Sequence, residues 1–508
     1  MPNTTFTDGH FIGTAVGVHE AESGNTFEFH TTQVGYPDGL VFRPLMWPSI
    51  LMGLLYGPVA ALNYTWTFMA SFNAICGYLA CRSLGVRVIG SLLGGVMVGW
   101  NHWVCTTLGN GQIEQSAIGA IALIWACGLL SEKKPLIASA GMFAIVVFSG
   151  ISVPNCALTA LLGLPILFAG RLLFQKKIFF RWSLVMLAAL LGALVVNQYQ
   201  SINFDSTLPQ FFKPRSGTDA SMASNATLES LISPADVAAE SYKVIHSTFL
   251  GTMWIYAGLA ALFIGGRKGW LVGTLAIWLI LLALGPTIQL NGGNYYLPIA
   301  VIQQFAEILQ HSSSYYRFVM GAIVALGIGA AVMIHSISKY SSLAALLIAL
   351  YWGNAAITET NQEAVHPLPY SAKKAFFNPI LTELKGTEGA VLDLPLLKDC
   401  DKNSFRYLNA YWLHRRPILH SMMPPVLYGR ANEFRIQQLK NALDSDRCES
   451  YYAAGIKGLL QKMDIGAVVI HQNGQCRIQD KHIDCIRQAL GTPTHQTQKI
   501  IWWDNLLQ

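Results

Sequence analysis

Three charged side chains could act on a phosphate or a hydroxyl group: Asp8, Glu114 and Arg317. A carboxylate can take a proton from a hydroxyl group or help to hold a metal-bound phosphate. A guanidinium group suits a phosphate or pyrophosphate because its N–H groups form paired, charge-assisted hydrogen bonds. Asp8 and Arg317 also have an ordinary interpretation. Asp8 would then be a solvated loop acid, and Arg317 would reach toward lipid headgroups.

Two of these groups have polar neighbours in the sequence. His10 follows Asp8 in the stretch TDGH, and His311 and Tyr316 precede Arg317 in the stretch HSSSYYRF. We predict that Asp8 is catalytic and that the other four residues contact the substrate. The sequence YPDG, at residues 36–39, indicates a turn.

Glu114 belongs to the polar loop LGNGQIEQ, at residues 108–115. We expect Glu114 to begin a descending span and His102 to end the ascending one, so that the two approach each other across the rim. Ionisable groups at membrane depth are expensive and indicate function, although less strongly at an interface. Glu114 is therefore a second predicted catalytic residue and His102 a substrate-binding one. The sequence shows no Walker loop, HExxH or GxSxG motif.

The composition indicates a membrane protein. Of 508 residues, 52% are hydrophobic and only 12% are charged, whereas soluble proteins carry about 25% charged residues. The net charge of +6 does not indicate nucleic acid, because the cations are spread over short turns between apolar runs. The expected surroundings are membrane lipid.

The orientation follows from the stretch at residues 156–197. Two apolar segments flank the hinge RLLFQKKIFFR, which carries four cations and no acid. Such a hinge stays on the cytoplasmic side. Counting crossings from it gives five inside turns with one acid, Glu132, and eleven cations: Arg82, Arg87, Lys133, Lys134, Arg171, Lys176, Lys177, Arg181, Arg267, Lys268 and Lys339.

About ten transmembrane helices are predicted within a domain at residues 59–358. The expected spans are residues 60–80, 88–106, 116–130, 135–149, 156–170, 182–197, 248–264, 270–284, 318–335 and 341–356. The preceding residues, 1–58, form a predicted extracytoplasmic segment, in which the apolar stretch 44–58 is too short and too rich in Pro and Gly to cross. We expect an interfacial or half-inserted helix there.

The composition changes after Thr358. Apolar runs of strand length (residues 389–396, 465–472 and 498–505) alternate with helical patterns at residues 432–443 and 480–490. This pattern predicts a small extracytoplasmic α/β domain at residues 359–508. It contains four cysteines, of which Cys476 and Cys485 could close a disulfide. A zinc site is disfavoured because the domain has no CxxC pair.

The chain resembles the bacterial membrane proteins of the GT-C glycosyltransferase superfamily that have an outer C-terminal α/β domain. The similar stretches are TDGH with YPDG, LNYTWTF with GYLACRSLG, GNGQIEQ, LGPTIQLNGG with YYRF, VLDLPL, and HRRPILHSMMPP. The resemblance implies transfer of a sugar from a polyprenyl-phosphate donor to an acceptor outside the bacterial inner membrane. An acid in the first outer loop performs this chemistry in the superfamily, and it corresponds to Asp8.

The sequence departs from this pattern because no transmembrane helix precedes Asp8. We expect either that such a helix precedes Met1 or that the protein is not a competent enzyme. The resemblance supplies neither a metal requirement nor an acceptor, so a divalent metal stays open as a cofactor. The alternative function is a non-catalytic scaffold whose outer domain binds a protein partner or an envelope polymer. Transport is disfavoured because the spans show no clear repeat and almost no charge.

Overall fold

The structure is a computed structural model of the whole chain. It describes residues 45, 47–109, 113–174, 178–203, 225–233, 237–239, 244–246, 248–290, 293–305, 315–363, 383–384, 388–394, 438–439, 450–472, 480–498 and 500–507. The chain divides into two compact units, one between Asn63 and Pro369 and the other containing Ser49–Leu62 and the residues from Tyr370 onward.

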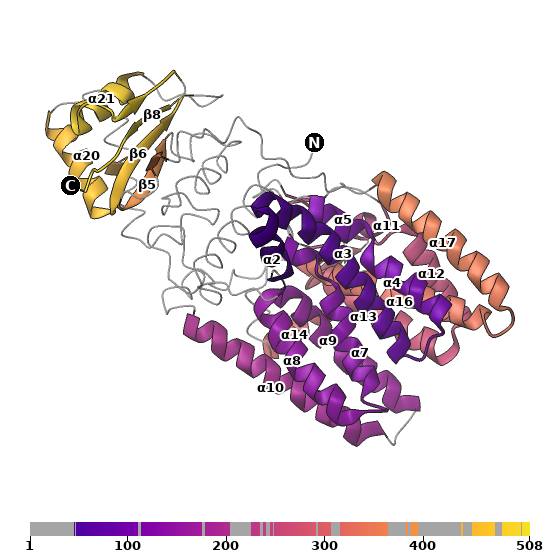
Figure 1. Cartoon of the computed structure of the whole chain (residues 1–508). Coiled ribbons are helices and arrows are strands. Elements are labelled where there is room, and N and C mark those ends of the chain that lie inside the picture. Colours follow the sequence, from indigo (N-terminus) through magenta and orange to yellow (C-terminus); the bar gives the residue numbers. More distant parts are fainter. Residues whose placement is uncertain are drawn as a thin grey trace. The chain divides into compact units, whose positions relative to one another are not determined.

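Helices account for all ten predicted spans (Figure 1). They are α3 (Pro58–Ser83), α4 (Val88–Gly99) with α5 (His102–Gly109), α7 (Gly119–Leu130), α8 (Pro135–Ser152), α9 (Pro154–Phe174), α10 (Phe179–Asn203), α12 (Thr252–Ile264), α13 (Gly266–Ala283), α16 (Val319–Ile337) and α17 (Ser342–Glu363). Among the described residues, seven segments are long and apolar enough to cross a membrane. The prediction of a polytopic helical membrane protein is confirmed.

Helix α16 is at the core of the helical unit. Every residue from Val319 to Ile334 is buried, so the helix has protein on every side. This surrounding explains why its residues are apolar all round. Small residues allow the close approach of its neighbours: a side chain at Gly90 or Gly94 of α4 would collide with the backbone or side chain of Ala331. The small residues of α16 at positions 327–331, in the sequence GIGAA, thus serve helix packing.

The outermost helices expose apolar side chains instead. Helices α8 and α10 run side by side (Figure 1). On α10 the exposed residues include Leu187, Leu190 and Leu194, and on α17 they include Leu347 and Leu350. Exposed leucines on both helices would be unfavourable in water but are expected where the solvent is lipid.

The basic turns lie together at one end of the bundle. Lys268 Nζ donates a hydrogen bond to the Gly85 carbonyl at 2.8 Å, and the Arg87 backbone N–H donates to His335 Nδ1 at 3.3 Å. Lys133 and Arg171 are within electrostatic range of Lys268. The turns that the sequence assigns to the cytoplasm therefore share one end, which is the arrangement that the crossing count requires.

Short elements occupy the connections at the other end. They are α6 (Ile113–Ser116), α11 (Leu228–Ile232), the hairpin of β1 (Val237–Ala239) with β2 (Val244–His246), the hairpin of β3 (Thr287–Leu290) with β4 (Gly293–Tyr296), α14 (Pro298–Phe305) and the 3-10 turn η5 (Tyr315–Phe318). Before α3, the stretch predicted to lie at the interface forms the ten-residue helix α2 (Trp47–Tyr56). Gly57, with φ +85°, ends it.

The C-terminal unit contains a four-stranded sheet in the order β5, β6, β8, β7. Its strands are β5 (Ala390–Leu394), β6 (Ile465–His471), β7 (His495–Gln496) and β8 (Ile500–Trp503), and its main helices are α20 (Ser450–Lys462) and α21 (Asp480–Leu490). Strands β5 and β6 are parallel, and the other pairs are antiparallel. Three predicted strands and the helix at residues 480–490 are confirmed.

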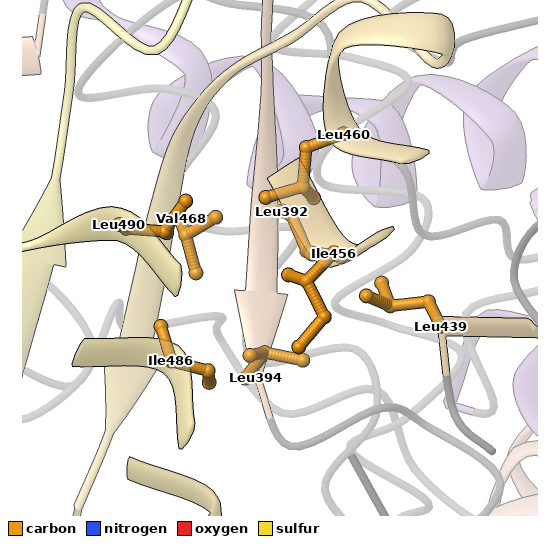
Figure 2. Close-up of a pocket in the computed structure, with 8 residues that line it drawn as sticks. All are labelled: Leu392, Leu394, Leu439, Ile456, Leu460, Val468, Ile486 and Leu490. Carbon is orange, nitrogen blue, oxygen red and sulfur yellow. The ribbon is translucent and has the colours of Figure 1, made fainter. Parts of the chain in front are cut away.

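Apolar side chains join this sheet to α20 and α21. Figure 2 shows Leu392, Leu394 and Val468 of the sheet facing Ile456, Leu460, Ile486 and Leu490 of the helices, around a small gap. Every described residue that lines the gap is apolar. Since nothing there could orient a polar ligand, the gap is core packing rather than a binding site. Asp393, which does not belong to this core cluster, lies 2.7 Å from the ring of His471.

Candidate functional site

The structure describes only some of the predicted site residues. His102, Tyr316, Arg317 and Cys485 are described. Glu114 lies in α6, but its side chain is outside the described part. Asp8, His10, His311 and Cys476 also fall outside the described residues. Cys485 is buried and disulfide-bonded. Because Cys476 lies outside the described residues, the pairing of these two cysteines stays a prediction.

A break in one span positions the first part of the site. The sequence predicts a continuous helix over residues 88–106, but Trp100 is extended and separates α4 from α5. Asn101 stabilises both helix ends. Its Nδ2 donates to the carbonyls of Met97 and Val98, and its Oδ1 accepts the N–H of Val104 at 3.0 Å. An asparagine that caps two helices explains why the chain turns here.

Trp103 then joins three segments that are distant in the sequence. Its indole Nε1 donates a 2.8 Å hydrogen bond to the Gln115 carbonyl, which fixes α5 against α6. Its ring lies 6.1 Å from the ring of Tyr316, centroid to centroid. The helix that carries Glu114 and the turn that carries Arg317 are therefore held by one side chain.

Arg317 lies on an aromatic support. Its guanidinium carbon is 5.8 Å from the centroid of the Tyr316 ring, a distance at which a cation is attracted to the ring face. The side chain is partly buried, and within the described part of the chain its Nε atom has no hydrogen-bond partner. Gln303 of α14 donates a hydrogen bond to the hydroxyl group of Tyr315, which secures the turn from the other side.

Arg317 lies at the end of the bundle opposite the basic turns. His335 follows Arg317 by eighteen positions of helix and turn, which corresponds to about 27 Å at 1.5 Å per residue. His335 contacts the basic turns. Arg317 and the basic turns are thus separated by nearly the thickness of a bilayer core.

Asn73 is a site-positioning residue that sequence reasoning missed. Its Nδ2 donates to the Ser116 carbonyl and its Oδ1 accepts the N–H of Gly119, both at 2.7 Å. These bonds hold the turn between α6 and α7 against α3. They also explain why Glu114 does not begin a span as predicted: α6 is a separate short helix, and α7 starts only at Gly119. The available signal was an asparagine within an apolar helix.

His102 contacts a different part of the unit from the one predicted. It begins α5 rather than ending the ascending helix, and it is 1% exposed. Its ring lies 4.7 Å from that of Phe249 and 6.1 Å from that of Trp254. Neither ring nitrogen has a hydrogen-bond partner among the described residues. Because these contacts surround the ring, His102 is a buried packing residue beside α12.

Glu359, at the end of α17, was also missed. Its carboxylate accepts the backbone N–H groups of Thr252 at 2.6 Å and Met253 at 3.0 Å. A carboxylate at a helix N-terminus satisfies N–H groups that have no partner within the helix. This acid therefore has a structural explanation. Among the described residues, no group of three His, Cys, Asp or Glu could hold a metal ion.

Comparisons with known proteins give a fold and no close relative. No protein-family model and no curated protein matches the sequence. The crystal structure of ArnT from Cupriavidus metallidurans bound to undecaprenyl phosphate is similar, with a TM-score of 0.54 and 11% identity over 98% of this chain and 93% of that one. Its apo form gives a TM-score of 0.50 with 9% identity, over 99% of this chain and 93% of that one.

A mutant of the arabinofuranosyltransferase AftD from Mycobacteria is also similar. The TM-score is 0.51 at 13% identity, over 95% of this chain and 37% of AftD. These similarities extend over nearly the whole chain, and at such low identities they concern the fold. Together with the membrane-length helices and the small C-terminal sheet, they confirm the architecture that the sequence predicts. The chain is a multi-pass membrane protein with the fold of the GT-C glycosyltransferases.

Proposed function

We propose that this protein is a membrane glycosyltransferase that moves a sugar from a polyprenyl-phosphate donor to an acceptor on the extracytoplasmic side of the inner membrane. The observation that carries the proposal is the bridge through Trp103, which holds the Arg317 turn next to the helix of Glu114. The shared fold supports it, because a protein with that fold has been solved with undecaprenyl phosphate bound.

Arg317 is the proposed phosphate ligand. Its position over Tyr316 orients the guanidinium group, and partial burial strengthens its attraction for an anion. In the transfer, the acceptor oxygen forms a bond to the anomeric carbon and the bond from that carbon to the phosphate oxygen breaks. Negative charge then develops on the departing lipid phosphate, where a nearby cation stabilises it.

The acceptor hydroxyl group must lose a proton as it attacks. Asp8 is the proposed general base, with Glu114 assisting and with His10, His311 and Tyr316 contacting the sugar or the phosphate. His102 has no part in this proposal because its ring packs against Phe249 and Trp254.

Binding of undecaprenyl phosphate to the protein in nanodiscs tests the role of Arg317. We expect the intact protein to prefer undecaprenyl phosphate to undecaprenol, and Arg317→Gln to weaken binding about tenfold, since a hydrogen bond to a charged group contributes about 1.5 to 3 kcal/mol. Arg317→Lys should bind with intermediate affinity because it keeps the charge but loses the paired geometry. The control is Arg181→Gln, an exposed arginine among the basic turns.

The role of Asp8 needs a measurement of turnover. The assay follows undecaprenyl phosphate released from lipid-linked sugars extracted from host membranes. Asp8→Asn should abolish release while leaving undecaprenyl phosphate binding unchanged. Equal affinity for undecaprenol and undecaprenyl phosphate would overturn the role of Arg317. Full turnover by Asp8→Asn would overturn the role of Asp8.

A further inference from the structure

Three basic turns converge at the end of the bundle far from Arg317. They connect α3 to α4, α12 to α13, and α16 to α17, and they bring Arg87, Lys268 and Lys339 to the same end of the unit. His335, on the last turn of α16, lies among them. Close packing of α4 on α16 at Gly90 makes this convergence possible.

The hydrogen bonds of His335 define the direction of its N–H group. The backbone N–H of Arg87 donates to Nδ1 at 3.3 Å, so Nδ1 is an acceptor and the ring proton is on Nε2. Lys268 Nζ lies 3.5 Å from that Nε2. An ammonium group and an N–H group are both donors, so they do not satisfy each other. Two donors that converge in this way match one oxygen of an anion.

Backbone carbonyls hold the cations without neutralising them. Lys268 Nζ donates to the Gly85 carbonyl at 2.8 Å, and an Arg87 N–H group donates to the Ser338 carbonyl. Within the described part of the chain, no carboxylate pairs with Arg87, Lys268 or Lys339. The charges of Arg87 and Lys268 are thus positioned by carbonyls, and none of the three charges is compensated by a described carboxylate, which favours an anionic ligand.

Arg171, another cation at this end of the bundle, shows the contrasting arrangement. Arg171 forms a two-point ion pair with the Glu132 carboxylate, and Arg181 donates to the backbone carbonyl of Glu132. The one acid of the basic turns therefore belongs to this second group. Arg87, Lys268 and Lys339 have no such acid among the described residues, and all three are within electrostatic range of His335.

Exposed aromatic side chains lie close in sequence to two of these cations. Tyr340, next to Lys339, is 92% exposed, and Phe263 and Trp270, on either side of Lys268, are 85% and 62% exposed. A soluble anion would interact with the cations alone and would gain nothing from these apolar side chains. A phospholipid has an anionic head and apolar chains, so it matches both parts of the surface.

We propose that Arg87, Lys268, His335 and Lys339 form a binding site for the phosphate of an anionic phospholipid in the leaflet next to the basic turns. The headgroup phosphate accepts hydrogen bonds from Lys268 Nζ and His335 Nε2, Arg87 and Lys339 complete the charge, and the acyl chains lie along α13 and α17. This site is separate from the proposed sugar chemistry and does not depend on it.

The test is native mass spectrometry of the intact protein released from nanodiscs that contain phosphatidylglycerol and phosphatidylcholine. We expect retained phosphatidylglycerol to exceed its share of the nanodisc lipid, and Lys268→Gln to reduce its affinity about fivefold, the effect of about one cation near an anionic membrane surface. Lys339→Gln should also reduce the affinity for phosphatidylglycerol. Because Lys339 is exposed, this variant separates a loss of lipid affinity from a folding defect. Lys134→Gln is the matched control, an exposed lysine outside the site.

Adding inorganic phosphate distinguishes a lipid from a soluble anion. If phosphate at millimolar concentration displaces no phosphatidylglycerol, the lipid assignment holds. Equal loss in Lys268→Gln and Lys134→Gln would mean that general surface charge retains the lipid, and the proposal would be wrong. Retention of phosphatidylcholine and phosphatidylglycerol in equal proportion would also overturn it.

Discussion

The indole nitrogen of Trp103 donates a 2.8 Å hydrogen bond to the backbone carbonyl of Gln115, across a connection whose central residues carry the polar sequence NGQ. The same ring contacts Tyr316, the residue beside Arg317. A single side chain thus sets the spacing between two polar segments that lie about 200 residues apart in the sequence.

Trp103→Phe tests this relationship. The change keeps an aromatic ring and removes the hydrogen bond, so we expect a loss of about 1 kcal/mol in the free energy of unfolding and a clear loss of undecaprenyl phosphate binding. Trp125→Phe is the matched control, because Trp125 Nε1 donates a similar bond, at 3.0 Å, to the Ala160 carbonyl. Similar stability losses with a binding defect only in Trp103→Phe would support a positioning role. Equal binding by both variants would contradict it.

Asn101→Ala tests the break between α4 and α5. The variant loses the cap of α5 and the bonds to the last turn of α4, so the free energy of unfolding should fall by about 1 to 2 kcal/mol. Asn101→Asp retains the acceptor for the N–H of Val104 but turns a buried carboxylate oxygen toward the carbonyls of Met97 and Val98, so it should lose more. The measurement is thermal unfolding of all variants in one detergent. If the Ala and Asp variants unfold together with the parent protein, the cap does not contribute.

Gly251→Ala tests a second special backbone position, at the start of α12. Its φ is +87°, and an added Cβ would lie 2.6 Å from the Trp254 ring, so both strain and overlap oppose the change. Gly266→Ala is the control: its φ is +55°, and its added Cβ would meet no atom within 4 Å. We expect about 1 kcal/mol of destabilisation at Gly266 and at least about twice that at Gly251. Equal destabilisation by Gly251→Ala and Gly266→Ala would show that overlap with the Trp254 ring does not contribute.

The spans and strands could be predicted because their signals are local. An apolar run of membrane length indicates a span wherever it occurs, and β5, β6 and β8 coincide with short runs rich in β-branched and aromatic residues. The signal was incomplete at residues 88–106, where apolar composition continues through the helix break. Composition measures average hydropathy, whereas Asn101 acts through the direction of its hydrogen bonds.

The site was less predictable because its contacts connect distant segments. The sequence made the Arg317 turn a candidate, but it could not show that Trp103 reaches both Tyr316 and Gln115. It also placed His102 opposite Glu114, although the break at Asn101 directs His102 toward Phe249. Glu359 was overlooked for the same reason: its partners are backbone N–H groups of another helix, and no sequence pattern displays these.

The final prediction concerns orientation, on which the proposed chemistry depends. The basic turns share one end of the bundle, so the positive-inside preference acts on all of them in the same direction. We expect alkaline phosphatase fused after Gln508 to be active and green fluorescent protein fused there to be dark. Green fluorescent protein fused after Lys339 should fluoresce, which makes this fusion the matched control. The reverse pattern at both positions would place Arg317 next to the cytoplasm. It would also move the uncompensated cations Arg87 and Lys268 to the outer leaflet, so the proposed sugar transfer and the lipid site would both lose the leaflets assigned to them.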